Sequence, residues 1–226
     1  MGFEYRKRKI LNALAKKEVV DVASLVKAIG VSDITIRRDL AALEKLNLLK
    51  RTHGGATKIE GSPIVNFDLK SNQNQAEKEK IGQKAALEVK EGEVIFIDCG
   101  STTLQMCSHL KHLNIKVITN SLPVVSALQN CQVSVNLIGG ELDQKRQAIH
   151  GKMAEWHIKQ YHAHKAFIGA DAIDKEGHLW ANSETEAEIS TAMITQSDKA
   201  YVLADSSKIG KKGYLKFSTE THEIIS

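Results

Sequence analysis

Short apolar segments alternate with helical segments from residue 76 onward, and this alternation limits the possible folds of the chain more than any other feature. Strands are predicted at EVIFID (93–98), KVITN (116–120), VSVNLIGG (133–140), KAFIGAD (165–171) and KAYVLAD (199–205). Helices are predicted at AEKEKIGQKAALEV (76–89), TTLQMCSHL (102–110), LPVVSALQ (122–129), 151–160 and ETEAEISTAMITQ (184–196). Such an alternation builds βαβ units. The predicted fold class is therefore α/β, with a Rossmann-like, mostly parallel sheet covered on both faces.

The N-terminal residues follow a different pattern, of three helices and a hairpin. A first helix is predicted over 5–16, and Asp21 is a suitable N-cap for a second helix that ends at Gly30. Ser32 caps a third helix, and LLKRT and ATKI flank His-Gly-Gly as a hairpin would. This order predicts a winged helix-turn-helix domain at 1–59. The polar stretch at 60–75 is the predicted linker to an α/β domain at 76–226.

The third helix has one face suited to the major groove of DNA. At 100° per residue, Ile36, Leu40 and Leu43 form a buried stripe, and Arg38 lies almost opposite it. Hydrogen-bonding and cationic groups followed by small residues are what an inserted helix needs. We expect Ser32, Thr35 and Arg37 near base edges and Arg38 and Arg51 on phosphate. The predicted DNA-binding residues are Ser32, Ile34, Thr35, Arg37, Arg38, Lys50, Arg51, His53, Gly54 and Gly55.

The charge distribution agrees with a polyanion partner for this domain. Residues 1–60 hold 13 basic and 7 acidic residues, a net charge of +6, whereas the remainder holds 18 basic and 20 acidic residues. A solvated basic helix would also give this asymmetry. The chain has no apolar run of membrane-spanning length, and its N-terminus lacks the apolar core of a signal peptide. A cytoplasmic protein with no membrane partner is expected.

Polar residues follow several of the predicted strands. In Asp98-Cys99-Gly100-Ser101-Thr102-Thr103, glycine frees the turn, hydroxyls donate, and unpaired N–H groups at a helix start attract an anion. Asn120, Gly140 and Asp171 lie at other strand ends, and ligands of open α/β sheets bind outside such carboxyl ends. The pattern favours a small, anionic, hydroxyl-rich ligand, although an ordinary capped turn explains the first segment equally well. Lys208 is a candidate cation for a phosphate.

The stretch VSDITIRRDLAALEKLNLLKRTHGGA resembles the DNA-binding signature of the DeoR family of bacterial transcription regulators. The segments DCGSTT, VITNS, IGG, FIGAD and LADSSK occur in that order in the family's effector domain, which is similar to ribose-5-phosphate isomerase. The resemblance implies a transcription regulator that senses a phosphorylated sugar. It further implies a homodimer or homotetramer on double-stranded operator DNA, most simply as a repressor of a sugar operon, with no enzymatic activity and no cofactor.

The resemblance also implies roles for particular residues. Ser101, Thr102 and Thr103 would hold the phosphate, and Arg146 would supply a second cationic contact. The full set of expected effector-binding residues is Asp98, Gly100, Ser101, Thr102, Thr103, Asn120, Gly140, Arg146, Asp171, Glu186 and Lys208. The chain departs from the family pattern at Ala172, where glycine is usual, and at Ser190 and Thr191, where a basic pair is common. It also stops at THEIIS, short of the family's usual final strand and helix.

Two other functions fit the same sequence. One is a sugar-phosphate isomerase-like enzyme, because Asp171, Glu186, Glu188 and Lys208 are suitable acid and base groups. The other is a constitutive DNA-binding protein whose second domain only oligomerises. A metal site is not expected: the four histidines between 150 and 164 match no zinc-site spacing and are interpreted as scattered surface residues.

Overall fold

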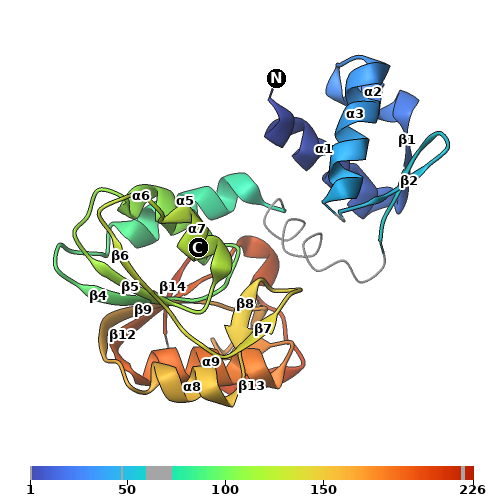
Figure 1. Ribbon diagram of the computed structural model, residues 1–226. Coiled ribbons are helices and arrows are strands. Elements are labelled where there is room, and N and C mark those ends of the chain that lie inside the picture. The colour runs from blue at the N-terminus through green and yellow to red at the C-terminus, as the bar shows by residue number, and fades with distance from the viewer. Residues whose placement is uncertain (1, 47, 60–72, 220–221) are drawn as a thin grey trace. The chain divides into compact units, whose positions relative to one another are not determined.

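The computed structural model describes residues 2–46, 48–59, 73–219 and 222–226, which form two compact units, Met1–Gln73 and Asn74–Ser226 (Figure 1). The boundary falls inside the linker predicted at 60–75, and residues 60–72 of that linker lie outside the described residues. No helix in the described ranges is both long enough and apolar enough to cross a membrane.

The N-terminal unit has the predicted three helices and wing. Its elements are α1 (Phe3–Lys17), β1 (Val19–Asp21), α2 (Val22–Ile29), α3 (Asp33–Lys45), β2 (Lys50–Thr52) and β3 (Gly55–Thr57). The Asp21 side chain accepts a hydrogen bond from the Ser24 N–H and so caps α2, and Gly30 ends that helix with a φ of 79°. The strands form an antiparallel sheet in the order β1-β3-β2. Buried residues from all three helices, among them Leu14, Leu25 and Leu40, fill the space between these elements.

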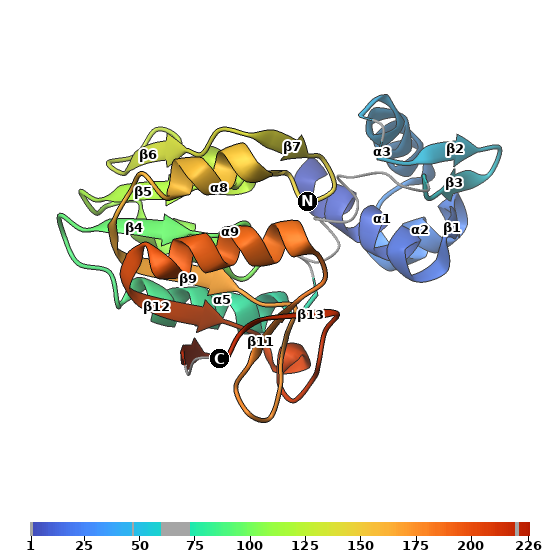
Figure 2. The ribbon, with the colours of Figure 1, turned by 90° about the horizontal axis from the view of Figure 1, so that it is seen from below.

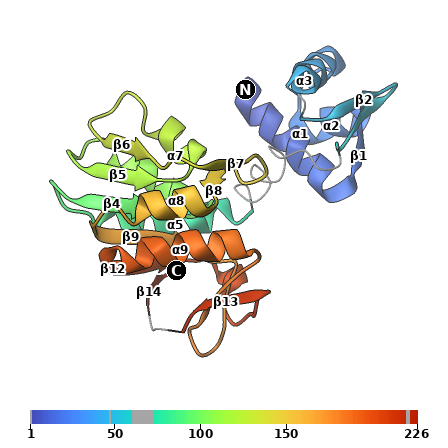
Figure 3. The same cartoon turned by 60° about the horizontal axis from the view of Figure 1, so that its bottom comes forward.

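The second unit is built on a parallel six-stranded sheet with the order β14-β12-β9-β4-β5-β6. The strands are β4 (Val94–Ile97), β5 (Lys116–Thr119), β6 (Ser134–Leu137), β9 (Ala163–Gly169), β12 (Ser197–Leu203) and β14 (Glu223–Ile225). Figures 2 and 3 show the strands from β6 to β12 side by side in this order. Each neighbouring pair is parallel. The mostly parallel α/β fold predicted from the alternation is confirmed.

Helices cover both faces of this sheet, as Figure 1 shows. They are α5 (Gln75–Ala86), η1 (Thr103–Met106), α6 (Cys107–Leu110), α7 (Leu122–Ala127), α8 (Lys152–Ile158) and α9 (Glu184–Thr195). Alternate residues of β4 explain the two layers, because successive side chains of a strand point to opposite faces. Ile95 and Ile97 pack with α5, α6 and α7, whereas Phe96 packs with α8 and α9.

Several short strands were not predicted. A hairpin of β7 (Glu141–Asp143) and β8 (Ala148–His150) precedes α8, and β10 (Ala172–Ile173), β11 (Leu179–Ala181) and β13 (Leu215–Ser218) form a second antiparallel sheet. Strands of two to four residues give too little alternation to detect in a sequence. Residues 223–225 form β14, which pairs in parallel with β12 at the edge of the large sheet.

Candidate functional site

Helix α3 presents the exposed face that the sequence predicted. Ile36, Leu40 and Leu43 are buried, whereas Arg37, Arg38 and Ile34 are exposed. The Ser32 hydroxyl accepts from the Thr35 N–H at 3.4 Å and also lies 2.9 Å from the Thr35 hydroxyl. Ile34 is 79% exposed, so an apolar side chain stands at the start of the helix with little of its surface covered. This face can therefore offer hydroxyl, guanidinium and apolar contacts to a partner.

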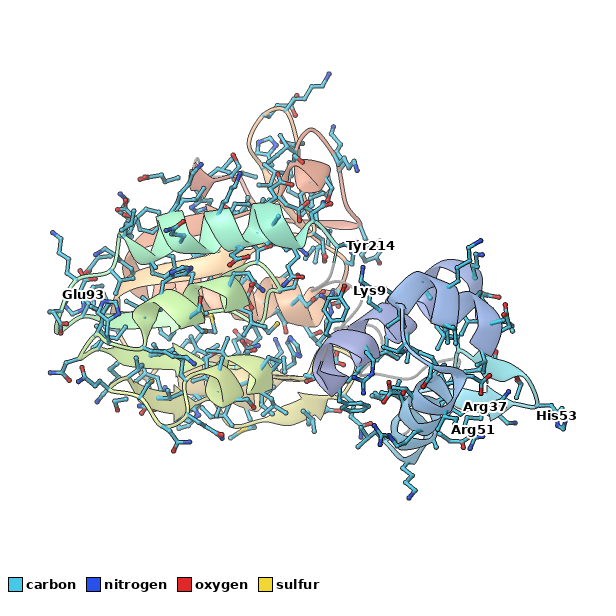
Figure 4. The ribbon with its side chains drawn as sticks, turned by 90° about the horizontal axis from the view of Figure 1, so that it is seen from above. Lys9, Arg37, Arg51, His53, Glu93 and Tyr214 are labelled. Atoms are coloured by element: carbon cyan, nitrogen blue, oxygen red, sulfur yellow. The ribbon has the colours of Figure 1, made fainter. Side chains whose placement is uncertain are left out.

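The Arg37 guanidinium is paired within its own helix. Its Nε donates to Asp33 Oδ1 at 2.6 Å, and this hydrogen bond raises the pKa of Arg37. Both side chains are about half exposed, so solvent and salt weaken the pair. Contact between Arg37 and a base edge would require this guanidinium to share or leave Asp33. Figure 4 labels Arg37 on α3 together with Arg51 on β2 and His53 at the hairpin tip.

A buried ion pair that the sequence analysis missed joins α1 to α3. Arg6 Nε and Nη2 donate to the two carboxylate oxygens of Asp39 at 2.5 and 3.0 Å, and both residues are less than a tenth exposed. This two-bond contact fixes the rotation of α3 relative to α1. The signal was present in the sequence, because Asp39 lies on the same side of the helix as the buried stripe at Ile36, Leu40 and Leu43.

The wing carries the predicted basic residues in exposed positions. Lys50, Arg51 and His53 are all exposed, and the Arg51 N–H donates to Glu44 Oε1 at 2.8 Å, which ties the wing to α3. Its two glycines have different surroundings. Gly54 is exposed with nothing near its missing Cβ, whereas a Cβ on Gly55 would lie 1.9 Å from the Val20 carbonyl oxygen. Gly55 is therefore required for packing of β3 against β1, a reason that the prediction of phosphate contact did not include.

In the second unit, the ends of β4 and β9 meet at the loop of residues 98–103, here called the phosphate loop after the ligand expected from the sequence. Asp98 accepts from the Cys99 N–H at 2.5 Å and from the Gly169 N–H at 3.1 Å. A Cβ on Gly169 would lie only 3.4 Å from Gly100 Cα, so the two chain segments touch where each has a glycine. Asp98 and Gly100 therefore hold the loop against β9.

The three hydroxyls of the phosphate loop are not equivalent. Thr103 is fully buried, and its hydroxyl lies 2.9 Å from the Asp98 carbonyl and 2.8 Å from the Gly100 carbonyl. Thr102 is also buried. Ser101 is partly exposed, and its hydroxyl faces a side chain from another element. The Thr103 hydroxyl thus shapes the loop, and the expected phosphate contacts of Ser101, Thr102 and Thr103 stay predictions.

The side chain that meets Ser101 is Lys78 of α5, a residue absent from the sequence prediction. Its Nζ lies 3.0 Å from Ser101 Oγ and 3.9 Å from Asp205 Oδ2, and the residue is only 4% exposed. Close packing of α5 on η1 brings it there, since a Cβ on Gly82 would lie 2.6 Å from the Gln105 Cβ. Lys78 shares a helix face with Ile81 and Ala85, and that position was the available signal.

An arginine and two carboxylates form a cluster near the phosphate loop. Arg146, in the β7–β8 turn, contacts Glu186 Oε1 and lies 3.6 Å from Asp171 Oδ2. Glu186 also accepts from the Ser183 hydroxyl at 3.0 Å, and Asp171 accepts from the Asn182 N–H at 3.0 Å. Burial raises the pKa of Glu186 although Arg146 lowers it. The structure thus brings together three of the residues that the resemblance pointed to.

His150 and Asn120 add polar atoms that lack protein partners among the described residues. His150 is 5% exposed with neither ring nitrogen hydrogen-bonded, and the fully buried Asn120 uses only its amide nitrogen, on the Ile149 carbonyl. Burial lowers the pKa of His150, while Asp98 and Arg146 are close enough to shift it in opposite directions. The interpretation of this histidine as a surface residue is therefore wrong. Asp98, Asn120, Arg146, His150, Asp171 and Glu186 are called the polar cluster below.

Two further predicted residues have distinct surroundings. Gly140 has a φ of 153°, and a Cβ there would lie 2.8 Å from the His150 carbonyl oxygen, so this glycine allows the β8 backbone to pass. Lys208 is half-buried at the end of η2 (Ser206–Lys208), and in the described part of the chain its ammonium group has no hydrogen bond or ion pair. Of the two, only Lys208 has a side chain to offer a ligand.

One group of potential metal ligands is explained by local structure. Donor atoms of Asp174, Glu176 and His178 lie within 4.8 Å of one another. The Asp174 carboxylate, however, already accepts from the Glu176 and His178 N–H groups, the His178 ring and the Trp180 indole. These four bonds close the β10–β11 turn. Burial raises the pKa of Asp174, but the bonds from His178 and Trp180 lower it to about 2. The carboxylate therefore acts as a turn-closing acceptor.

Comparison with known families covers both units. Residues 6–61 match the family described as DeoR-like helix-turn-helix domain, and residues 73–225 match the DeoR C terminal sensor domain. Similar solved structures include ribose 5-phosphate isomerase A of Methanocaldococcus jannaschii, with 19% identity and a TM-score of 0.45 over 61% of this chain and 55% of that one.

Curated proteins with related sequences are named as transcriptional regulators. A Bacillus subtilis protein named as the uncharacterized HTH-type transcriptional regulator FruR is 35% identical over 94% of this chain and 86% of its own length. The lactose phosphotransferase system repressor of Streptococcus mutans is 33% identical over 96% and 88%. The L-fucose operon activator of Haemophilus influenzae is 31% identical over 95% and 87%.

Proposed function

This chain belongs to the DeoR family of transcriptional regulators, and we propose that it represses a sugar-metabolism operon under the control of a phosphorylated sugar. In this proposal the helix-turn-helix unit holds operator DNA, and the ligand contacts both the phosphate loop and the polar cluster, which share Asp98. The observation that carries the proposal is the buried Lys78 ammonium on Ser101, at the same strand ends as the polar cluster.

The phosphate group fits the Ser101 end. A hydroxyl, a buried ammonium 3.0 Å away and the half-buried Lys208 provide donors and positive charge, which is the chemistry that phosphate needs. The buried ammonium also favours an anion, because Lys78 is only 4% exposed and its positive charge is little screened by solvent.

The sugar hydroxyls fit the polar cluster. Among the described residues, the Asn120 side-chain oxygen and both His150 ring nitrogens have no hydrogen-bond partner, and buried polar atoms of this kind are costly unless they gain one. The carboxylates of Asp171 and Glu186 add acceptors that Arg146 holds in place. A ligand with several hydroxyls supplies the donors and acceptors that these groups need.

A symmetric operator has two half-sites, and each half-site needs its own helix-turn-helix unit. We propose a homodimer or homotetramer, with half-sites about 34 Å apart or a multiple of that distance. The mass of the protein in solution, measured by light scattering with and without DNA, tests this part. A monomer on DNA would contradict it.

Replacement of Lys78 by methionine is expected to weaken sugar-phosphate binding by about tenfold or more, because a charge-assisted contact is lost. The measurement is calorimetric titration of the full chain with ribose 5-phosphate, fructose 6-phosphate and the corresponding unphosphorylated sugars. Lys80→Met is the matched control, since Lys80 is exposed on the same helix. DNA affinity without ligand should be unchanged in both variants.

Three results would count against this account. If Lys78→Met bound the phosphates as tightly as the wild type, the phosphate would not lie at Ser101. If no sugar phosphate bound to the wild type, the second unit would fit a constitutive DNA-binding protein better. Turnover of a sugar phosphate that Glu186→Gln abolished would favour the isomerase alternative.

A further inference from the structure

The first turn of α5 lies where the linker enters the second unit. Asn74 immediately precedes the helix and has a φ of 53°, a left-handed conformation that is uncommon for a residue other than glycine. An asparagine in this position commonly caps its own helix. Here no side-chain cap bond forms, and the Asn74 amide nitrogen instead donates to Asp205 Oδ1 at 2.9 Å. The conformation of the chain at Asn74 therefore depends on a residue at the end of β12.

Asp205 connects this turn to the proposed phosphate contact. Its carboxylate is 2% exposed, accepts from Asn74 and from Ser207, and lies 3.9 Å from Lys78 Nζ. Lys78 in turn lies 3.0 Å from Ser101. One buried ammonium thus faces both the predicted phosphate contact and the carboxylate that holds Asn74.

A second connection runs between the same two segments. Glu77, in the first turn of α5, accepts from the Ser206 N–H at 2.7 Å and from the Ser206 hydroxyl at 3.2 Å. Ser206 begins the short η2 turn that ends at Lys208. Both candidate phosphate-binding lysines therefore belong to elements that these hydrogen bonds tie together.

We infer that the Asn74–Asp205 hydrogen bond transmits ligand binding from the phosphate loop to the linker. The inference rests on the proposed function, because it requires a phosphate at Ser101. An incoming phosphate dianion draws the Lys78 ammonium toward itself and places negative charge near the buried Asp205 carboxylate. The electrostatic interactions of the Asp205 carboxylate then change, and the strength of the Asn74–Asp205 hydrogen bond changes with them. Asn74 and Asp205 are positioning residues in this account, since neither needs to touch the ligand.

The test is Asn74→Gly in the full chain, because glycine keeps the positive φ at little cost and removes only the side-chain contact. We expect the variant to bind ribose 5-phosphate, or fructose 6-phosphate if that binds the wild type more tightly, within about threefold of wild-type affinity. In a typical coupled system, the ligand changes operator affinity by about 5- to 150-fold. In the variant this fold-change should fall toward one, which means that the ligand no longer alters operator affinity. Asn74→Asp should show the same loss, because it places a carboxylate against Asp205.

The matched control is Asn130→Gly. Asn130 also has a positive φ, of 57°, and is exposed on a different loop, so the substitution should leave coupling intact. Retained coupling in both Asn74 variants, with a wild type that binds and responds to the ligand, would overturn this inference and leave the proposed function standing. A wild type that binds neither sugar phosphate would overturn both.

Discussion

Arg37→Ala is expected to reduce the preference for operator over random duplex DNA by about tenfold or more, because an arginine fork on a base edge is the commonest specific contact in the major groove. The adjacent Arg38 is exposed on the same helix and is the matched comparison. If Arg38 contacts phosphate, Arg38→Ala should weaken binding to both DNAs alike. It should also reduce the slope of the logarithm of affinity against the logarithm of salt concentration by about one.

The measurement is the affinity of each variant for an operator duplex and for a random duplex at several salt concentrations. The Arg37–Asp33 pair makes the result informative, since the guanidinium must share or leave Asp33 when it contacts a base. An Arg37→Ala protein that keeps full discrimination would remove Arg37 from the base-contacting set. If Arg38→Ala lost discrimination, the two assignments would be reversed.

Gly55→Ala is expected to destabilise the DNA-binding unit by about 1–3 kcal/mol or more, because overpacking costs this much and the clash is with backbone. The new Cβ would lie 1.9 Å from the Val20 carbonyl oxygen, so β3 cannot stay paired with β1 without a shift of one strand. Gly54→Ala is the control, since nothing lies within 4 Å of the position of its Cβ.

Hydrogen exchange in the full-length protein reports on this unit separately from the other. The Val22 amide, which donates to the Gly54 carbonyl at 2.9 Å, should exchange much faster in Gly55→Ala and at nearly the wild-type rate in Gly54→Ala. Equal protection in the two variants would mean that Gly55 has no packing role. A loss of DNA binding by Gly54→Ala with unchanged protection would support backbone contact of the hairpin tip with phosphate.

The sequence predicted those features that local pattern determines. The leucine stripe of α3, the cap at Ser32 and the apolar strands each depend on neighbours within one or two turns or on simple alternation, and the structure has all of them. The polar strand ends were also identifiable, because parallel strands bring their carboxyl ends to one edge. Arg146, Asp171 and Glu186 were placed together only by resemblance, and the structure brings them into contact.

The residues that sequence analysis missed are charged or polar side chains buried by distant partners. Lys78 looks like one of many lysines in AEKEKIGQK until packing of α5 on η1 places it against Ser101. Asp39 is buried only because Arg6 reaches it from another helix. His150 is buried in β8 of the unpredicted β7–β8 hairpin, which pairs with the segment after β5 through the Ser121–Ala148 bridge and the Ile149 N–H bond to the Asn120 carbonyl. No pattern along the chain records such pairs, although a charge on an apolar helix face indicates that a partner exists.

The most direct test of the account joins its two halves in one measurement. Duplexes that bind the full-length protein are selected from a random-sequence pool, and the affinity for the selected duplex is then measured with and without ribose 5-phosphate and fructose 6-phosphate. The account predicts enrichment of one repeated half-site and a drop of at least about fivefold in affinity with one of these sugar phosphates but not with its unphosphorylated sugar. An enriched duplex whose affinity is the same under every condition would contradict control by a sugar phosphate, and a pool that stays unenriched would contradict specific DNA recognition.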